Sequence, residues 1–129
     1  MLAADVIDAF ARAWNTEDDT ERLRLLSSAC LPDAHFLAPQ GRTVGVKALS
    51  AGIAEFRRAF PAAVVSFGSP DGYGGFARVT WATDWNNDQP PLTGEDFAHL
   101  AADGRIRLLV SFDGAAAAIR PPEPQPSDP

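Results

Sequence analysis

The sequence predicts a single α+β domain, in which a cone-shaped, curved antiparallel sheet wraps around three N-terminal helices and leaves one apolar pocket. Two observations predict this class. Apolar residues recur every three or four positions in much of the first half of the chain, and every second position in the second half. A length of 129 residues with 46% hydrophobic residues suits one core. We expect the domain to span residues 1–114, followed by a tail over 115–129.

The first predicted helix is defined by apolar residues at helical spacing: Val6, Ile7, Phe10, Ala13 and Trp14. A polar segment over 15–20 then predicts a turn. Asp18 or Thr20 can cap a second helix, whose apolar face includes Leu23 and Leu26 and which we expect Pro32 to end.

A third helix is predicted after Gly45, and Pro61 should stop it. Its apolar stripe repeats at three and four residues: Val46, Leu49, Ile53, Phe56 and Phe60.

Strands are predicted over residues 34–38, 64–67, 76–85, 94–100 and 106–112. Turns are expected between them at 39–41, 69–72, 86–91 and 101–104, which are polar or rich in glycine and proline. The strand over 76–85 has the clearest alternation, and one face is predicted to carry Val79, Trp81, Thr83 and Trp85. The opposite face then carries Arg78, Thr80, Ala82 and Asp84.

Composition argues against several classes of partner. The formal net charge is −6 and the pI about 4.7, so the surface repels phosphate backbones and anionic headgroups. We therefore expect no nucleic acid and no membrane partner. The N-terminus lacks the pattern of a secretion signal, and the single cysteine, Cys30, suits a reducing compartment. Both features predict a cytoplasmic protein.

Metal and cofactor chemistry find little support in the residue pattern. His35 and His99 lie on separate predicted strands without a nearby set of ligands. The glycines at 72–75 fall between strands, whereas a phosphate-binding loop precedes a helix. We expect neither a metal nor a cofactor.

The remaining possibility is acid–base catalysis in an apolar pocket, and Asp96 is the candidate acid or base. Asp96 alternates in phase with Ala98 and Leu100, so it shares the apolar face of its strand. A carboxyl there loses hydration, which raises its pKa and lets it hold or donate a proton near neutral pH. The alternative is a structural carboxylate tied to a backbone N–H or an arginine, and the residues alone leave both interpretations open.

Several short motifs occur in a characteristic order along the chain, roughly from Val6 to Gly114. They are Phe10-Ala-Arg-Ala-Trp14, Leu31-Pro-Asp-Ala34, Pro39 with Gly41 and Gly45, Phe60-Pro61, Arg78-Val-Thr-Trp81, Gly94-Glu-Asp-Phe97, and Asp103-Gly-Arg-Ile106 running to Phe112-Asp113. In this order and spacing the sequence resembles the nuclear transport factor 2-like superfamily, which implies the cone-shaped fold and a pocket for a small apolar or aromatic molecule.

Two enzyme families of that superfamily suggest a mechanism. In ketosteroid isomerases the oxyanion aspartate lies eight residues before the glycine of the Asp-Gly-Arg-Ile motif, which corresponds here to Asp96. Trp14 occupies the position of their tyrosine and Ala38 that of their base, so the resemblance does not imply steroid isomerisation. The SnoaL-like polyketide cyclases need one such aspartate as acid/base and no cofactor.

The resemblance therefore implies a cofactor-free SnoaL-like cyclase, isomerase or lyase acting on an apolar carbonyl compound, with Asp96 as acid/base. The expected pocket residues are Phe10, Trp14, Phe36, Ile53, Phe56, Val79 and Trp81. The alternative is a non-catalytic binding or dimerisation module with the same pocket. A second polar side chain facing the space beside Asp96 would favour catalysis, and an otherwise apolar wall would favour binding alone.

Two further expectations concern the surface and the tail. Phe97 and His99 are out of phase with Asp96, so we expect them on the outer face of the sheet beside Arg107 and Leu109 or their neighbours. An apolar outer face predicts a homodimer, as is usual for related folds. The proline-rich stretch from Pro121 should be disordered and contribute no stability.

Overall fold

Three amphipathic helices form where the sequence repeats apolar residues at helical spacing. In the computed structural model, which describes residues 3–114, they are α1 (Ala3–Trp14), α2 (Asp19–Ala29) and α3 (Val46–Ala59). Asp18 caps α2: its carboxylate accepts a hydrogen bond from the Glu21 N–H at 2.8 Å. Among the described residues, no helix is both long and apolar enough to cross a bilayer. The expectation for the tail concerns residues outside the described range.

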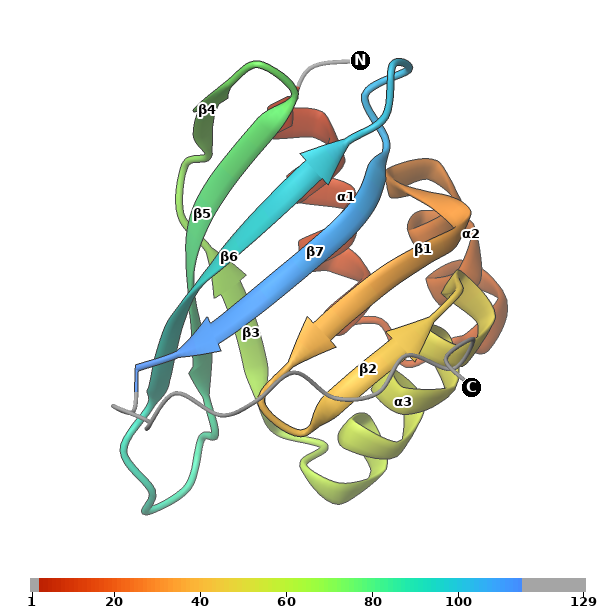
Figure 1. Ribbon diagram of the computed structural model, residues 1–129. Helices are drawn as coiled ribbons and strands as arrows, with labels where there is room; N and C mark the ends of the chain where they lie inside the picture. Colours follow the sequence, from red (N-terminus) through yellow and green to blue (C-terminus); the bar gives the residue numbers. More distant parts are fainter. Residues whose placement is uncertain (1–2, 115–129) are drawn as a thin grey trace, which may run out of the picture.

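Seven strands form one open sheet in the order β2-β1-β7-β6-β5-β3, with β4 paired to β5. Their bounds are β1 (Cys30–Ala38), β2 (Gly41–Val44), β3 (Val64–Phe67), β4 (Asp71–Tyr73), β5 (Phe76–Asp84), β6 (Leu92–Leu100) and β7 (Ile106–Asp113). Figure 1 shows the long strands β5, β6, β7 and β1 side by side.

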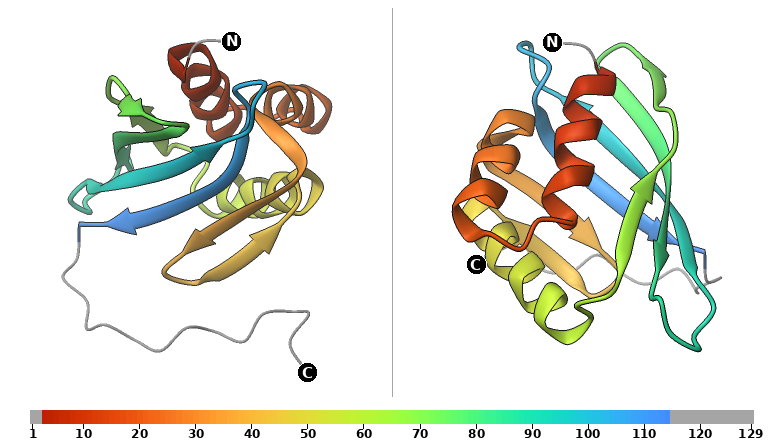
Figure 2. Two further views of the ribbon diagram at one scale, coloured as in Figure 1. Left: turned by 45° about the horizontal axis from the view of Figure 1, so that its top comes forward. Right: turned by 180° about the vertical axis from the view of Figure 1, so that it is seen from behind.

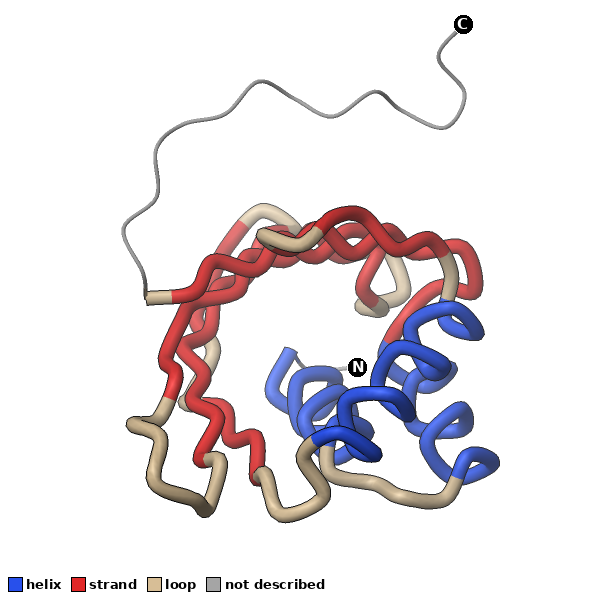
Figure 3. The backbone as a smooth tube through the Cα atoms, turned by 90° about the horizontal axis from the view of Figure 1, so that it is seen from below, coloured by secondary structure: helices blue, strands red, loops and turns tan. Residues whose placement is uncertain are grey.

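The helices cover one face of the sheet, which curves around them (Figures 2 and 3). The core lies between the two layers, and its most deeply buried apolar side chains include Val6, Phe10, Leu26, Ile53 and Ile106. An α+β cone with its helices on the concave face is the predicted class, and the structure confirms it.

The sheet differs from the prediction in one pairing and two strands. β1 runs parallel to β7, so the sheet is mixed, while the other pairs are antiparallel. β1 and β2 lie between α2 and α3 in the chain, and neither β2 nor β4 was predicted as a strand. β4 replaces part of the turn expected at 69–72. Both strands are short, four and three residues, and too brief for a period of two to be visible.

The end of α2 was predicted too late. The helix ends at Ala29, and Pro32 lies inside β1 instead of terminating the helix. Pro32 is exposed and falls within the irregular segment between Cys30 and His35, where the β1–β7 register shifts. A proline is tolerated there because no regular ladder hydrogen bond needs its missing N–H.

The alternation predicted for β5 is correct. Val79 and Thr83 are buried on the concave side and Trp81 is half-buried, whereas Arg78 and Thr80 are exposed. The register of the central strand was therefore assigned correctly from the sequence.

The outer face agrees with the prediction on β6 and at Arg107 of β7, but not at Leu109. Phe97 is exposed and His99 half-buried, as expected for that face. Arg107 is also exposed, but Leu109 is only 4% exposed and belongs to the core. The ladder between β6 and β7 shifts between His99 and Leu100, and this bulge changes the phase of the residues that follow.

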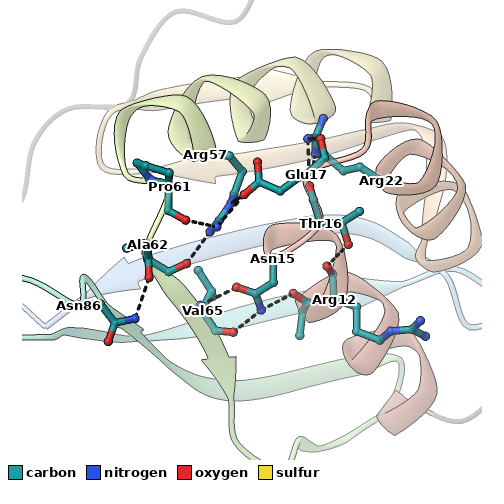
Figure 4. A network of polar contacts seen from close by, with 12 residues as sticks. Arg12, Asn15, Thr16, Glu17, Arg22, Arg57, Pro61, Ala62, Val65 and Asn86 are labelled. Carbon is teal, nitrogen blue, oxygen red and sulfur yellow. Dashed lines mark hydrogen bonds and ion pairs between the residues drawn. The ribbon is translucent and has the colours of Figure 1, made fainter.

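Polar side chains attach the end of α1 to the sheet (Figure 4). The Asn15 amide donates to the Val65 carbonyl at 2.7 Å, and its oxygen accepts from the Val65 N–H at 2.8 Å. Because Asn15 follows Trp14 directly, these two bonds fix where the last aromatic residue of α1 lies.

The buried Arg57 joins α3 to the loop before β3 and to the turn after α1 (Figure 4). Its guanidinium donates to the carbonyls of Pro61 and Ala63 at 2.9 and 2.6 Å, and to Glu17 Oε1 at 3.0 Å. A buried guanidinium needs such a complete set of acceptors. These contacts tie the C-terminal ends of α1 and α3 to the start of β3.

Candidate functional site

Asp96 lies in the middle of β6, and its side chain faces the concave side of the sheet. It pairs with Val79 on β5 and with Ser111 on β7, and it is 4% exposed. The strand alternation that predicts this orientation is therefore correct, and a carboxyl group occupies the interior of the cone.

Burial raises the pKa of Asp96 to about 6, because desolvation disfavours the charged carboxylate. Ser111 and Trp81 approach the carboxyl and partly offset this rise by hydrogen bonding. Their contacts are loose, since Trp81 Nε1 and Asp96 Oδ1 are both fully buried without a partner at hydrogen-bonding distance and angle. A donor and an acceptor are thus left unsatisfied beside each other, which is costly in a protein interior and common at functional sites.

A cavity of about 380 Å³ opens onto Asp96. Ser111, Thr83 and Asp113 also line it, so the surroundings of Asp96 are polar on one side. A larger and more open hollow of about 670 Å³ shares Phe67, Trp81 and Asp113 with this cavity, but its lining does not include Asp96. The smaller, more enclosed cavity suits a small molecule better.

Five of the seven expected pocket residues line this cavity: Phe10, Trp14, Phe36, Phe56 and Trp81. The other two do not. Ile53, on α3, is fully buried in the core. Val79 is 3% exposed and does not line the cavity. Their apolar periodicity predicts burial correctly, but periodicity does not distinguish a core position from a cavity wall.

Aromatic rings form one wall of the cavity. Trp14 meets Phe56 edge to face at a centroid distance of 5.6 Å, and Trp85 lies 6.1 Å from Phe56. Trp85 also lies 4.8 Å from Phe60. Such rings present flat apolar surface to a ligand at little cost in side-chain entropy.

Sequence reasoning missed Ser111, Asp113, Thr83 and Arg42 as parts of the cavity wall. Ser111 and Asp113 are in phase with Leu109, but the bulge at the start of β7 conceals that phase. Thr83 was assigned to the inner face without a role. Arg42 lies on β2, which was not predicted as a strand, so no orientation could be inferred for it.

Neither histidine lines the Asp96 cavity. His35 Nδ1 contacts Arg42 Nη1 at 2.9 Å, and the His99 ring stacks on Phe76 at 4.6 Å. Within residues 3–114 no group of three or more His, Cys, Asp or Glu side chains is placed to hold a metal ion. Burial raises the pKa of the Cys30 thiol to about 12, so it is not a nucleophile at neutral pH.

No protein-family model and no curated protein matches the sequence. Solved structures do. A protein from Agrobacterium tumefaciens str. C58, described as a candidate isomerase of the SnoaL-like family, is 28% identical with a TM-score of 0.75 over 85% of this chain and 95% of its own.

Two further structures share the fold at lower identity. A candidate polyketide cyclase from Sinorhizobium meliloti is 20% identical with a TM-score of 0.68, over 84% of this chain and 94% of its own. A nuclear transport factor 2-like protein of unknown function from Exiguobacterium sp. 255-15 is 18% identical with a TM-score of 0.69, over 86% and 99%. With its helix-covered curved sheet and these neighbours, the chain has the fold of the nuclear transport factor 2-like and SnoaL-like structures.

Proposed function

We propose that the protein is a cofactor-free enzyme of the SnoaL-like type, a cyclase, isomerase or lyase that acts on a small apolar carbonyl compound, with Asp96 as its acid/base. One observation carries the proposal. The Asp96 carboxyl is buried at the wall of a cavity, and its Oδ1 and the neighbouring Trp81 Nε1 are both unsatisfied. A ligand carbonyl oxygen that accepts from the Trp81 N–H would satisfy the donor and leave Oδ1 to take a proton from the carbon beside that carbonyl.

The chemistry follows from the protonation state of Asp96. The ionised carboxylate removes a proton from the carbon beside the ligand carbonyl, and the electron pair of that C–H bond moves onto the carbonyl oxygen as an enolate. The Trp81 N–H and the Ser111 hydroxyl are the nearby donors for the developing negative charge. In an isomerisation the proton held by Asp96 then returns to a carbon of the enolate. In a cyclisation the enolate carbon attacks a second carbonyl of the ligand, and the proton goes to the oxygen of that carbonyl.

The polar part of the cavity wall supports catalysis over simple binding. Ser111, Thr83 and Asp113 line the same cavity as Asp96, so the remainder of the wall is not uniformly apolar. A module that only binds an apolar ligand has no need of a desolvated carboxyl, which reduces stability once it ionises.

The position of the steroid-isomerase base argues for a different substrate. Ala38 lines the cavity at that position and carries no proton acceptor, and Trp14 stands where those enzymes have a tyrosine. The candidate isomerase and candidate cyclase among the structural neighbours lend support to a SnoaL-like activity.

Proton exchange tests the proposal without knowledge of the natural substrate. Benzylacetone and β-tetralone, two apolar aromatic ketones, are incubated with the protein in D₂O, and loss of the protons beside the carbonyl is followed by ¹H NMR. We expect the wild type to accelerate exchange and Asp96→Asn to reduce it to the buffer rate. Asp33→Asn removes an equal charge at an exposed position of β1 and should exchange like the wild type.

Two outcomes would overturn the enzyme proposal. One is exchange in Asp96→Asn at the wild-type rate. The other is a wild-type rate equal to that of buffer for ketones that demonstrably bind, which would leave a binding module as the function.

A further inference from the structure

The convex face of the sheet, opposite the helices and the Asp96 cavity, has an apolar centre. Strand pairing places Leu37, Val110 and Phe97 side by side across β1, β7 and β6. Phe112 lies two residues beyond Val110 on the same face, and it and Phe97 are both exposed and meet edge to face. No described helix covers this face (Figure 1). Contiguous apolar surface of this kind marks a contact with another macromolecule.

Arg42 flanks this apolar centre on the β2 side. It pairs with Leu37, so its side chain lies on the convex face and points away from the Asp96 carboxyl. Arg42 is half-buried, and its Nη1 contacts His35 Nδ1 at 2.9 Å, which brings no negative charge. Within residues 3–114 no carboxylate forms an ion pair with Arg42. Five other arginines there do have an acidic partner: Arg22, Arg24, Arg57, Arg78 and Arg105. A half-buried guanidinium without an anion is costly.

Glu95 flanks the same centre on the β6 side. It pairs with Phe112 on β7 and with Thr80 on β5, which places its side chain on the convex face. Glu95 is half-buried, and it forms no hydrogen bond or ion pair within the described part of the chain. It also attracts Arg78, but Asp71 already binds that guanidinium at 2.8 Å. The apolar centre therefore lies between a half-buried cation and a half-buried anion, neither of which has an ion-pair partner.

Arg42 and Glu95 lie too far apart to pair within one copy. β1 and β7 separate β2 from β6, so three strand spacings of about 4.8 Å put the two residues about 14 Å apart. In a dimer with two-fold symmetry, residue i of one copy contacts residue j of the other, and j contacts i. A two-fold axis through the apolar centre near Val110, midway between the charges, places Arg42 of each copy opposite Glu95 of the other.

We infer that a second copy of this chain binds the convex face, in a register set by two symmetric ion pairs between Arg42 and the partner's Glu95. The contact removes the apolar centre from water, and ion pairs beside it are stronger than pairs on an open surface. The curvature of the sheet suits this arrangement (Figure 3). Two convex surfaces touch at the centre and diverge at the flanks, where long side chains such as arginine and glutamate can reach across. The inference does not depend on the proposed function of Asp96.

Charge reversal tests the register. Sedimentation equilibrium of the full chain at low salt gives the dissociation constant of the dimer. We expect the wild type to dimerise, and we expect Arg42→Glu and Glu95→Arg each to raise the dissociation constant at least about tenfold, because each places like charges opposite one another twice per dimer. Lys47→Glu is the control. It reverses an exposed charge on α3, in the helical layer, and should keep the dissociation constant within about twofold of the wild type.

A mixture of the two variants tests the pairing itself. A heterodimer of Arg42→Glu with Glu95→Arg contains two pairs of opposite charge, whereas a homodimer of either variant contains two pairs of like charge. Native mass spectrometry of the equimolar mixture should therefore show the heterodimer as the dominant dimer. Its formation also shows that both variants fold, so that loss of the homodimers does not come from loss of structure.

Four results would overturn the inference. They are a monomeric wild type, single variants that dimerise as tightly as the wild type, a Lys47→Glu variant that dissociates as they do, and a mixture without heterodimer. If Phe97→Arg gives monomers while the Arg42 and Glu95 variants stay dimeric, the convex face is the interface but the inferred register is wrong.

Discussion

The indole of Trp81 lies over Gly94, its cross-strand partner, so closely that a Cβ on Gly94 would overlap the ring. The same Cβ would meet the Phe112 carbonyl. The absence of a side chain at Gly94 therefore leaves room for the Trp81 ring over β6. The Trp81 N–H approaches Asp96, which lies two residues beyond Gly94 on β6.

Substitution of Gly94 by alanine should displace Trp81 and destabilise the fold. The added methyl overlaps a ring and a backbone carbonyl, and such overpacking costs about 1–3 kcal/mol. We expect a lower melting temperature and a shifted Trp81 indole N–H resonance in a ¹H–¹⁵N spectrum. Gly52→Ala is the control: Gly52 lies in α3 with open space at its Cβ, so alanine should stabilise the helix by about 0.5–1 kcal/mol. An unchanged Trp81 resonance in Gly94→Ala would contradict this account.

Asn15 should contribute measurably to stability because both polar groups of its amide bind β3. Asn15→Ala leaves the N–H and carbonyl of Val65 without those partners, and we expect a loss of about 1–3 kcal/mol in urea unfolding. Gln89→Ala removes an exposed amide in the turn after β5 and should change stability by less than about 0.5 kcal/mol. Equal stability of the two variants would show that the Asn15 bonds contribute little.

The outer face of the sheet carries exposed aromatic residues, and we predict a homodimer through it. Phe97 and Phe112 are 42% and 56% exposed and meet edge to face at 5.8 Å. Together with Phe76, 61% exposed, they form apolar surface that no described helix covers (Figure 1). Light scattering at high micromolar concentration should give twice the chain mass.

A charged residue at the centre of this surface should separate the dimer. Phe97→Arg should give monomers, whereas Val44→Arg, at an exposed apolar position on the edge strand β2, should remain dimeric. A wild-type monomer under these conditions would contradict the predicted interface.

The sequence was sufficient for those features that long, regular periodicity determines. The α+β class, the inward side of β5 and the orientation of Asp96 all follow from alternation over nine-residue strands. The features it missed depend on pairing between distant segments. Neither the parallel contact of β1 with β7 nor the short strands β2 and β4 leave a local pattern.

The candidate site was predictable only in part for the same reason. Asp96 and five aromatic wall residues come from segments with clear periodicity. Ser111 and Asp113 follow a bulge that changes the phase of β7, and Arg42 enters the wall through an unpredicted edge strand. Strand pairing brings these residues to the cavity wall, and a single sequence does not encode pairing locally.

Stability should fall with rising pH because of Asp96. Its pKa is about 6 in the folded protein against 3.8 in the unfolded chain, so the unfolded state loses the proton first as the pH rises. Between about pH 4 and pH 7 the wild type should lose about 2 kcal/mol of stability relative to Asp96→Asn, which does not titrate. Asp33→Asn retains Asp96 and should lose stability relative to Asp96→Asn as the wild type does. A wild type that gains stability over Asp96→Asn across this range would mean that the carboxylate is stabilised by a structural partner.

The most direct measurement is the titration of the Asp96 carboxyl itself, by ¹³C NMR of aspartate-labelled protein, with Asp96→Asn used to assign the resonance. The account predicts a midpoint near pH 6, because desolvation at the cavity wall outweighs the loose contacts from Ser111 and Trp81. A midpoint below about pH 4, at or under the ordinary value for aspartate, would contradict it. Asp96 would then be a structural carboxylate, and the acid–base function would lose its central residue.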